Sequence, residues 1–299
     1  MSMGTIDMGL LRCACVCALA VPMLSTLPAC GSETTGETNA VVLTELTFGK
    51  LVRGEDGEVL MSGDRNVAAG LNLDDRNSDA RDLEGCRRRD FVSPAGEEGI
   101  DNQFALLYET IEDQFPGAVE GIIQGTINEG RLLLMIEMSG VDDPYEDDSV
   151  EVRVMLGMGR PDLSASDRIA SHQTFEIDPE APVSITHGSI HEGVLEAGPF
   201  DVEFPVAVFN VFFDLRLHNS TLQATQNPDG SWSGIIAGGV TMAQILNIAM
   251  MADDMQETQI TPLLEIVLPT MSDLQRNDMG VCEQISAGMQ FRATPAFTF

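Results

Sequence analysis

The chain contains few basic residues. Its 299 residues include 16 lysines and arginines against 47 aspartates and glutamates, for a formal net charge of −31, and Lys50 is the sole lysine. Proteins bind a phosphate backbone largely through lysine and arginine, and a large negative charge repels it. We therefore expect no nucleic-acid partner.

Signatures of common enzymes are also missing. The sequence contains no glycine-x-serine-x-glycine elbow, no phosphate-binding loop and no dinucleotide glycine fingerprint. A catalytic triad that meets only in space leaves no signal of this kind, so the absence removes only the families that carry such motifs. It favours a protein that is not an enzyme.

The chain does contain enough apolar sequence for a folded domain. Hydrophobic residues make up 43% of it and charged residues 21%. Disordered acidic proteins have a lower hydrophobic content, and a chain of this length can bury a core of ordinary size. The composition predicts a folded, acidic domain.

An apolar run lies near the amino terminus and is short. Arg12 precedes the run from Cys13 to Leu24, and small residues follow it. A membrane-spanning helix needs about twenty apolar residues, whereas a basic residue, a shorter run and a small-residue exit are typical of a signal peptide. We expect residues 1–29 to be this signal peptide and to be removed.

The next segment, Leu27-Pro28-Ala29-Cys30, resembles the lipobox of bacterial lipoproteins. The resemblance implies that Cys30 is diacylated and becomes the new amino terminus, and Gly31 after it implies transfer to the outer membrane. Acyl chains on one cysteine anchor a protein without a spanning segment. Two alternatives remain open: a plain secretory signal cleaved near Ala29, and a single buried strand.

The six cysteines have different expected fates. Three lie between residues 13 and 17, in the segment expected to be removed, and Cys30 is the expected lipid site. Cys86 and Cys282 remain, and a cysteine pair in an oxidising compartment favours a disulfide. It would close a loop of nearly two hundred residues and contribute roughly 5 kcal/mol in the chain-entropy model. The alternative is two separately buried thiols.

Beyond the signal we expect a tether and one domain. Residues 30–40 are interpreted as a lipidated, flexible tether, because the segment 32–39 has no apolar residue. Residues 41–299 are interpreted as a single acidic, β-rich domain. Removal of residues 1–29 takes away one base, Arg12, and one acid, Asp7, so the remaining chain keeps its net charge of −31.

Apolar residues at helical spacing occur in two main places. They recur every three or four positions between residues 102 and 129, interrupted by Pro116, which predicts a pair of helices. Thr241 and Gln244 match a capping box, which predicts a shorter helix near 241–252. A further short helix is expected from Pro262.

Elsewhere the apolar period is two, which predicts strands. Residues 54–99 are rich in Asp, Gly and Asn and predict long loops crossed by short strands. Strands in a run, with helices segregated at two places, indicate an α+β fold whose core is mainly an antiparallel β sandwich or barrel. The predicted strands are 41–48, 132–138, 150–156, 173–177, 183–189, 200–208, 211–218, 221–226, 231–237 and 285–291.

One acidic loop offers closely spaced oxygen ligands. Calcium prefers six to eight hard oxygen ligands, so the loop predicts a calcium site, although Ala80 stands where an EF-hand has its turn glycine. The alternative is a solvated loop paired with nearby arginines. The acidic loop 142–148 is another candidate of the same kind. The candidate ligands are Asp75, Asn77, Asp79, Asp82 and Asp101.

Two histidines, His187 and His191, are four residues apart. On a helix this spacing can chelate zinc. Gly188 and the β-rich surroundings predict a strand, so we expect surface histidines here.

The layout as a whole resembles that of exported bacterial lipoproteins that have no assigned activity. It has an Asp-rich loop, a cysteine, the helix start Gly99–Asn102, a β-rich middle and the segment Gly280-Val281-Cys282. The resemblance implies a location in the cell envelope and an architecture, but no reaction.

We therefore expect a membrane-anchored, non-enzymatic binding or envelope-structural module, with a protein or glycan partner left open. The rival is a periplasmic or surface hydrolase that uses Asp and Glu as acid and base. A deep pocket with two carboxylates would favour the hydrolase, and a concave apolar sheet face would favour a ligand carrier.

Overall fold

A computed structural model describes residues 37–114, 117–208, 211–256 and 259–299 of the chain. The expected signal peptide, Cys30 and Pro116 lie outside the described residues. Strand β1 (Glu37–Phe48) begins inside the range expected to be the tether, because its first residues already pair with β6. Residues 37–40 therefore belong to the folded domain.

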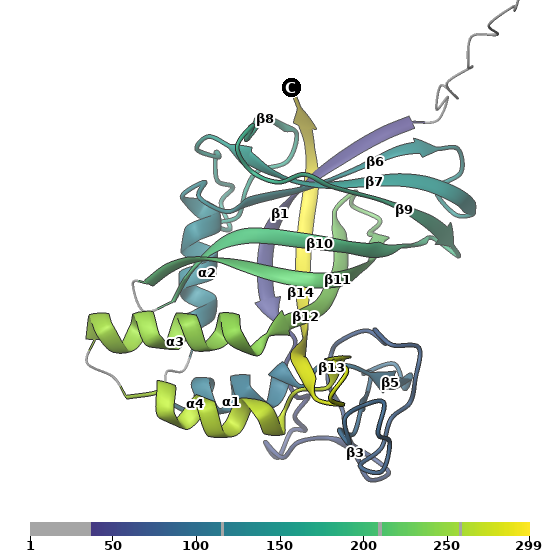
Figure 1. Cartoon of the computed structure of the whole chain (residues 1–299). Coiled ribbons are helices and arrows are strands. Elements are labelled where there is room, and N and C mark those ends of the chain that lie inside the picture. The colour runs from purple at the N-terminus through teal and green to yellow at the C-terminus, as the bar shows by residue number, and fades with distance from the viewer. Residues whose placement is uncertain (1–36, 115–116, 209–210, 257–258) are drawn as a thin grey trace, which may run out of the picture. The chain divides into compact units, whose positions relative to one another are not determined.

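Eight antiparallel strands form a closed barrel (Figure 1). The strands follow one another around the ring in chain order, and β1 pairs with the last strand to close it. This confirms the α+β class with a mainly antiparallel core. Of the two predicted arrangements, sandwich and barrel, the core is a barrel. After β1 the barrel strands are β6 (Leu133–Val141), β7 (Asp147–Met158), β9 (Ser184–His191), β10 (Val194–Val208), β11 (Val211–Gln226), β12 (Trp232–Thr241) and β14 (Cys282–Thr298).

Alternation along the strands fills the barrel interior with apolar side chains. On β14, Ile285, Ala287 and Met289 are all buried. Ile285 pairs with Val240 of β12, and Met289 pairs with Ile236. Successive side chains on a strand point to opposite faces. This register therefore places these apolar residues, which lie an even number of positions apart on each strand, on the interior side.

Strands β10 and β11 differ from their predicted bounds. β10 begins at Val194, upstream of the predicted start at residue 200, because the strand continues through Gly198 and Pro199 with a shift in its pairing to β11. β11 is one strand where two were predicted. Its pairing with β12 shifts between His218 and Thr221, where Asn219 has a φ of 48°.

Short strands lie outside the barrel. β8 (Gln173–Ile177) pairs with β7 and runs parallel to β14, and β13 (Leu274–Arg276) pairs with β14. The segment between β1 and the first helix consists of loops crossed by short strands, as predicted. Those strands are β2 (Met61–Ser62), β3 (Arg65–Asn66), β4 (Phe91–Val92) and β5 (Glu98–Ile100).

The four helices occur where the sequence predicts them. α1 (Phe104–Gln114) and α2 (Ala118–Asn128) form the predicted pair, and α3 (Met242–Gln256) and α4 (Thr261–Val267) follow β12. Helix α3 extends past its predicted end at residue 252. The short 3₁₀ helix η1 (Leu268–Thr270) continues from α4. None of the helices in the described ranges is long and apolar enough to cross a membrane.

The helix ends follow their predicted signals in part. The backbone N–H of Gln244 donates to Thr241 Oγ1 at 3.2 Å, which confirms the cap of α3. In a complete capping box the Gln244 side chain would also accept the backbone N–H of Thr241. Here the Gln244 side-chain amide donates to the Asp214 carbonyl of β11 at 2.9 Å. Gly130 follows α2 with a φ of 77°, and a side chain there would collide with the carbonyl of Gly159.

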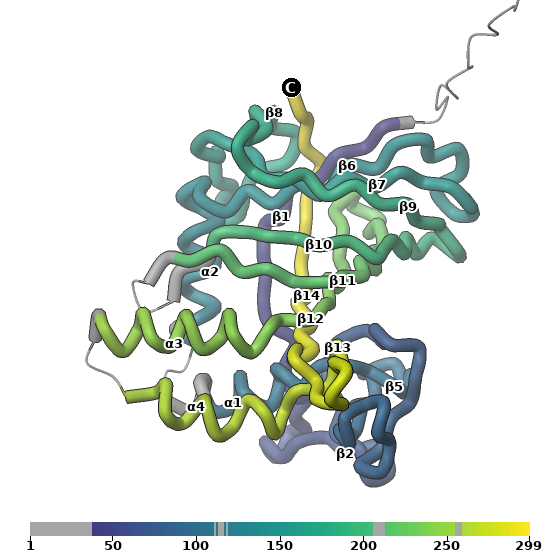
Figure 2. Tube along the Cα trace, viewed as in Figure 1, coloured from purple at the N-terminus to yellow at the C-terminus, as the bar shows by residue number. Residues whose placement is uncertain are grey.

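The helices gather at one end of the barrel. α2 contacts β1 and β10, which lie on opposite sides of the ring. α1 contacts β14, and α3 contacts β11, β12 and β14. Figure 2 shows α1, α3 and α4 together at this end, so the helices cover the barrel mouth that their apolar faces point toward.

Candidate functional site

An apolar cavity of about 320 Å³ lies between the four helices and the mouth of the barrel. Leu215, Val240 and Ala287 form the barrel side of it, from strands β11, β12 and β14. Among the described residues that line the cavity, none carries a charge. Small-molecule pockets occupy about 300–1,000 Å³ and are mostly apolar, so the cavity is large enough for a small apolar ligand.

Aromatic rings form one wall of the cavity. The ring of Phe48, at the end of β1, lies 4.8 Å from that of Phe104 and 5.6 Å from that of Tyr108, centroid to centroid. Phe104 and Tyr108 are four residues apart on α1, so they lie on one face of the helix. The Lys50 ammonium lies 5.0 Å from the centroid of the Tyr108 ring.

Helix α4 forms the wall opposite the barrel strands. Its cavity-facing residues Ile260, Leu263, Leu264 and Val267 repeat at helical spacing, beginning at the residue before the helix. Every residue of α4 keeps some exposure to solvent, and Leu263 is 52% exposed. Since Leu263 both lines the cavity and reaches solvent, this helix is a thin cover over the cavity.

Small side chains explain why the mouth is hollow. Ala249 and Ala252 of α3 and Ala287 of β14 all line the cavity and are buried. Protein interiors are normally packed to near crystal density, so larger residues at these positions would fill the space. The cavity therefore results from three alanines that face it.

A second, polar groove of about 780 Å³ lies outside the barrel wall. Its lining comes from the loop 72–75, from strands β7, β9, β10, β11 and β14, and from β13. Its ionisable side chains are Asp74, Asp75, Asp148, His187, Glu196 and His218.

Two histidines have carboxylate partners. His218 Nδ1 lies 3.2 Å from Asp201 Oδ2, and His191 Nδ1 lies 3.2 Å from Glu146 Oε2. His187 and His191 are on strand β9, as predicted, so they do not share a helix face.

The predicted calcium ligands hold the local backbone. Asp79 Oδ1 accepts the N–H of Arg81, and Asp82 accepts the N–H of Glu84 at 2.9 Å and the hydroxyl of Ser78 at 3.2 Å. Bonds of this kind form turns around a carboxylate.

The other three predicted ligands are not brought together. Asn77 donates to Glu98, Asp75 is exposed at the edge of the polar groove, and Asp101 is buried, where it accepts the N–H of Leu73 at 2.7 Å. Over the part of the chain that the structure describes, no three His, Cys, Asp or Glu side chains gather where they could hold a metal ion. The calcium site stays a prediction.

Three buried carboxyls lie near the start of β14. Burial raises the pKa of Asp101 to about 9, with the charge of Asp273 as the next cause. Burial also raises the pKa of Asp273 to about 7 and that of Asp90 to about 6. Asp273 accepts both the N–H and the hydroxyl of Ser286, and that hydroxyl accepts the N–H of Gln103 at 2.8 Å. We call this region, residues 71–103 and 269–288, the acidic junction.

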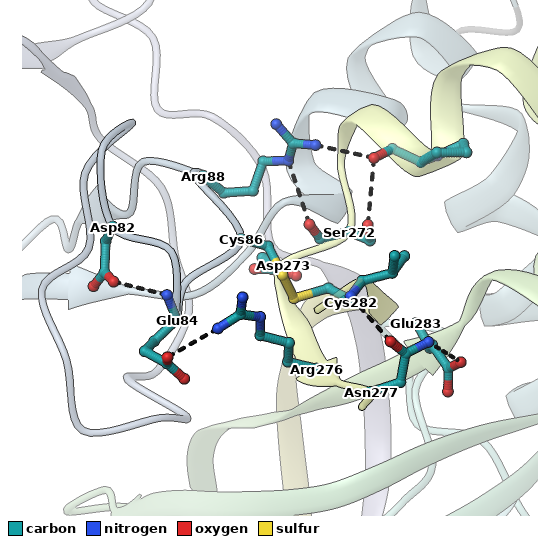
Figure 3. The surroundings of a disulfide bond; sticks show 12 residues. Asp82, Glu84, Cys86, Arg88, Ser272, Asp273, Arg276, Asn277, Cys282 and Glu283 are labelled. Atoms are coloured by element: carbon teal, nitrogen blue, oxygen red, sulfur yellow. Dashed lines mark hydrogen bonds and ion pairs between the residues drawn. A yellow bond between two sulfur atoms is a disulfide. The ribbon is translucent and has the colours of Figure 1, made fainter. Parts of the chain in front are cut away.

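The disulfide Cys86–Cys282 crosses the acidic junction, with its Cα atoms 6.1 Å apart. Figure 3 shows the links beside it. Arg88 donates to the Ser272 carbonyl at 3.3 Å and to the Pro269 carbonyl at 2.9 Å. On the other side of the bond, Arg276 pairs with Glu84 at 2.9 Å. The predicted disulfide is therefore one of several links between the same two segments.

Comparison of the chain with protein-family models, with curated proteins and with solved structures finds no match. The interpretation of the site therefore depends on its geometry and chemistry.

Sequence reasoning missed the cavity as a site, although it identified most of the elements around it. The apolar stripes of α1, α2 and α3 predict buried faces. Whether two such faces fill the space between them depends on side-chain sizes on elements distant in sequence. The signal that could have found the cavity is the set of alanines at otherwise large apolar positions, such as Ala249 and Ala252 on the buried face of α3.

Proposed function

We propose that the protein is a lipid-anchored envelope protein that binds an apolar small molecule in the helix-covered mouth of its barrel. The cavity carries this proposal: it has a volume suited to a small ligand, an uncharged lining and a thin helical cover. Such a protein is a non-enzymatic binding module, and the apolar molecule is its partner.

The barrel supports the proposal by its construction. Strands can hold a cavity at a barrel mouth because the closed hydrogen-bond ladder, and not the packing of the mouth, fixes the wall. Here the wall strands are paired all round, while the helices supply the remaining lining. An occupant of the cavity would meet the rigid strands on one side and the half-exposed α4 on the other.

The test uses the neutral fluorescent probe N-phenylnaphthylamine. In Ala249→Leu the larger side chain projects into the cavity, and we expect the affinity for the probe to fall about tenfold or more. The matched control is Ala243→Leu, which adds the same atoms to an exposed position of the same helix. Equal affinity in the two variants, or no saturable binding to the natural chain, would contradict the proposal.

The anchor part of the proposal is supported by the lipobox-like segment that ends at Cys30. Metabolic labelling with an alkyne fatty acid should place label on the natural chain and on Cys17→Ala, and none on Cys30→Ala. Mass spectrometry should identify acylated Cys30 at the amino terminus. Export without label would favour the plain secretory signal instead.

The rival function, hydrolysis, would have to use the polar groove. One observation favours it: Asp201 holds the imidazole of His218 at the edge of a groove that also contains carboxylates. Chromogenic glycosides and esters should be turned over by the natural chain and not by His218→Gln if this function is correct. No turnover above the His218→Gln background would exclude it for those substrates.

A further inference from the structure

We propose that the cavity selects an uncharged apolar ligand and discriminates against an anionic one of the same shape. This inference rests on the proposed function and adds the chemical class of the ligand. It would separate neutral lipids, isoprenoid-like or aromatic molecules from ionised fatty acids and sulfonates.

Among the described lining residues, no buried side chain offers a free donor to an ionised group. Its polar side chains are Thr110, which is exposed at the rim, and Tyr108. The Tyr108 hydroxyl already donates to Glu112 Oε2 at 3.0 Å. An anion moved into such a cavity would lose its hydration without gaining a donor, which costs far more than transfer of a neutral group.

The surroundings of the aromatic wall add a fixed negative charge. Glu112 spans from Tyr108 to the N–H of Gly117, which Glu112 Oε1 accepts at 2.9 Å. This backbone hydrogen bond is the main cause that lowers the pKa of Glu112, so its carboxylate stays ionised at neutral pH. A negative charge is therefore held directly behind the cavity wall.

The two cations that the structure describes near this wall are already paired. Lys50 lies over the Tyr108 ring and bonds Glu120 at 2.7 Å, and Arg53 pairs with Glu109. Among the side chains that the structure describes, this wall therefore has three carboxylates, Glu109, Glu112 and Glu120, against these two cations. An anionic ligand at the wall meets a net negative charge, within a chain that carries −31 overall.

The test compares two probes with nearly the same ring system. N-phenylnaphthylamine is neutral, and anilinonaphthalene sulfonate adds one negative charge. At fixed ionic strength we expect the natural full chain to bind the sulfonate about tenfold or more weakly than the neutral probe. Glu112→Gln removes the fixed charge and should narrow this gap several-fold, chiefly by tighter binding of the sulfonate.

Two further variants complete the test. Glu120→Gln frees Lys50 and should narrow the gap in the same direction, which covers the case in which Glu112→Gln does not fold. The control is Glu176→Gln, which removes one exposed carboxylate on β8. Figure 1 shows β8 at the top of the molecule and α1 at the bottom, so this variant should leave the difference in affinity between the two probes unchanged.

Each result has a distinct meaning. Sulfonate binding in the cavity as tight as neutral binding would overturn the ligand class but leave the proposed function standing. The proposed ligand class would also be overturned if Glu112→Gln and Glu120→Gln changed the difference in affinity between the two probes no more than Glu176→Gln does. The charges at the aromatic wall would then not cause that difference. Failure of both probes to bind would contradict the proposed function itself.

Discussion

The barrel and the acidic junction are held together by different interactions. The barrel buries a large continuous set of apolar side chains from its strands and helices. The loop part of the junction, residues 71–103, belongs to a stretch with a separate and small apolar cluster, which consists of Leu51, Ala68, Phe91, Ile100 and Ala105 with Val59 beside them. It relies instead on a disulfide, buried carboxyls and hydrogen bonds from side chains to the backbone.

Asn102 illustrates how the junction works without a large core. Its amide donates to the carbonyls of Gly49 at 3.0 Å and Ala69 at 2.6 Å, and accepts the N–H of Gly288 at 3.2 Å. One buried side chain thus satisfies backbone groups of three segments. The comparison teaches that loops attached to a barrel can be fixed by a few directional contacts, which are then sensitive to redox state and pH in a way that apolar packing is not.

Loss of the disulfide should give the largest effect on this comparison. We expect Cys86→Ser with Cys282→Ser to lower the free energy of unfolding by about 2–5 kcal/mol, because the unfolded chain regains the freedom of a long loop. Urea unfolding measures the change. Amide exchange should rise first in residues 71–103 while the barrel strands stay protected. An unchanged urea midpoint would show that the neighbouring contacts suffice.

The pH dependence should come next. The pKa values of Asp90, Asp101 and Asp273 are raised in the fold, so the unfolded chain ionises at lower pH than the folded chain. Their stabilising contribution is complete below about pH 4 and is lost as the pH rises through about 6 to 9. Thermal unfolding from pH 5 to pH 9 should show stability falling, with Asp101→Asn reducing the fall by about 1–3 kcal/mol.

The exposed carboxylate of Asp75 provides the control for that experiment. Asp75→Asn makes the same substitution and removes the same ionised carboxylate from the unfolded chain, but Asp75 is not buried in the fold. Its variant should keep the pH slope of the natural chain. If both variants reduced the slope equally, general charge repulsion and not burial would be the cause.

The smallest expected effect concerns Arg88, which connects the junction to the cover of the cavity. Arg88→Ala removes the hydrogen bonds to the carbonyls of Pro269, within η1, and of Ser272, just after it. We expect a loss of about 1–2 kcal/mol and faster amide exchange across residues 259–270. Arg87→Ala, an exposed neighbour, should change neither. Equal amide exchange rates in the two variants would show that the contacts of Arg88 do not stabilise the cover of the cavity.

Much of the fold can be predicted from the sequence because its signals are local. The alternation of β6, β7 and β14 and the stripes of α1 and α2 follow from periodicity alone. The prediction is wrong for the start of β10 and for the division of β11 into two strands. At Gly198, Pro199 and Asn219 the pairing with neighbouring strands outweighs the local preference of these residues for turns. Closure into a ring depends on contacts between the first and last strands and has no local signal.

The site is less predictable, for a physical reason. The spacing of Asp75, Asn77, Asp79 and Asp82 is visible in the sequence, but whether carboxylates point at one another or at backbone N–H groups depends on the turns they form. Cys86 and Cys282 were predictable because elimination left a single pair. The cavity depends on Ala249 and Ala287 lining the same space from α3 and β14. These residues are distant in the sequence, so no short stretch of it indicates their proximity.

The pairing of Ala40 with Ala296 has a consequence for how the chain folds. The ring closes only when strands separated by almost the whole domain meet, so its last ladder is the most non-local contact in the sheet. Loop-closure entropy opposes such contacts, and domains rich in them fold slowly. Until β14 arrives, β1 and β12 each present an unpaired edge, so the half-finished barrel is the species most exposed to pairing with other chains.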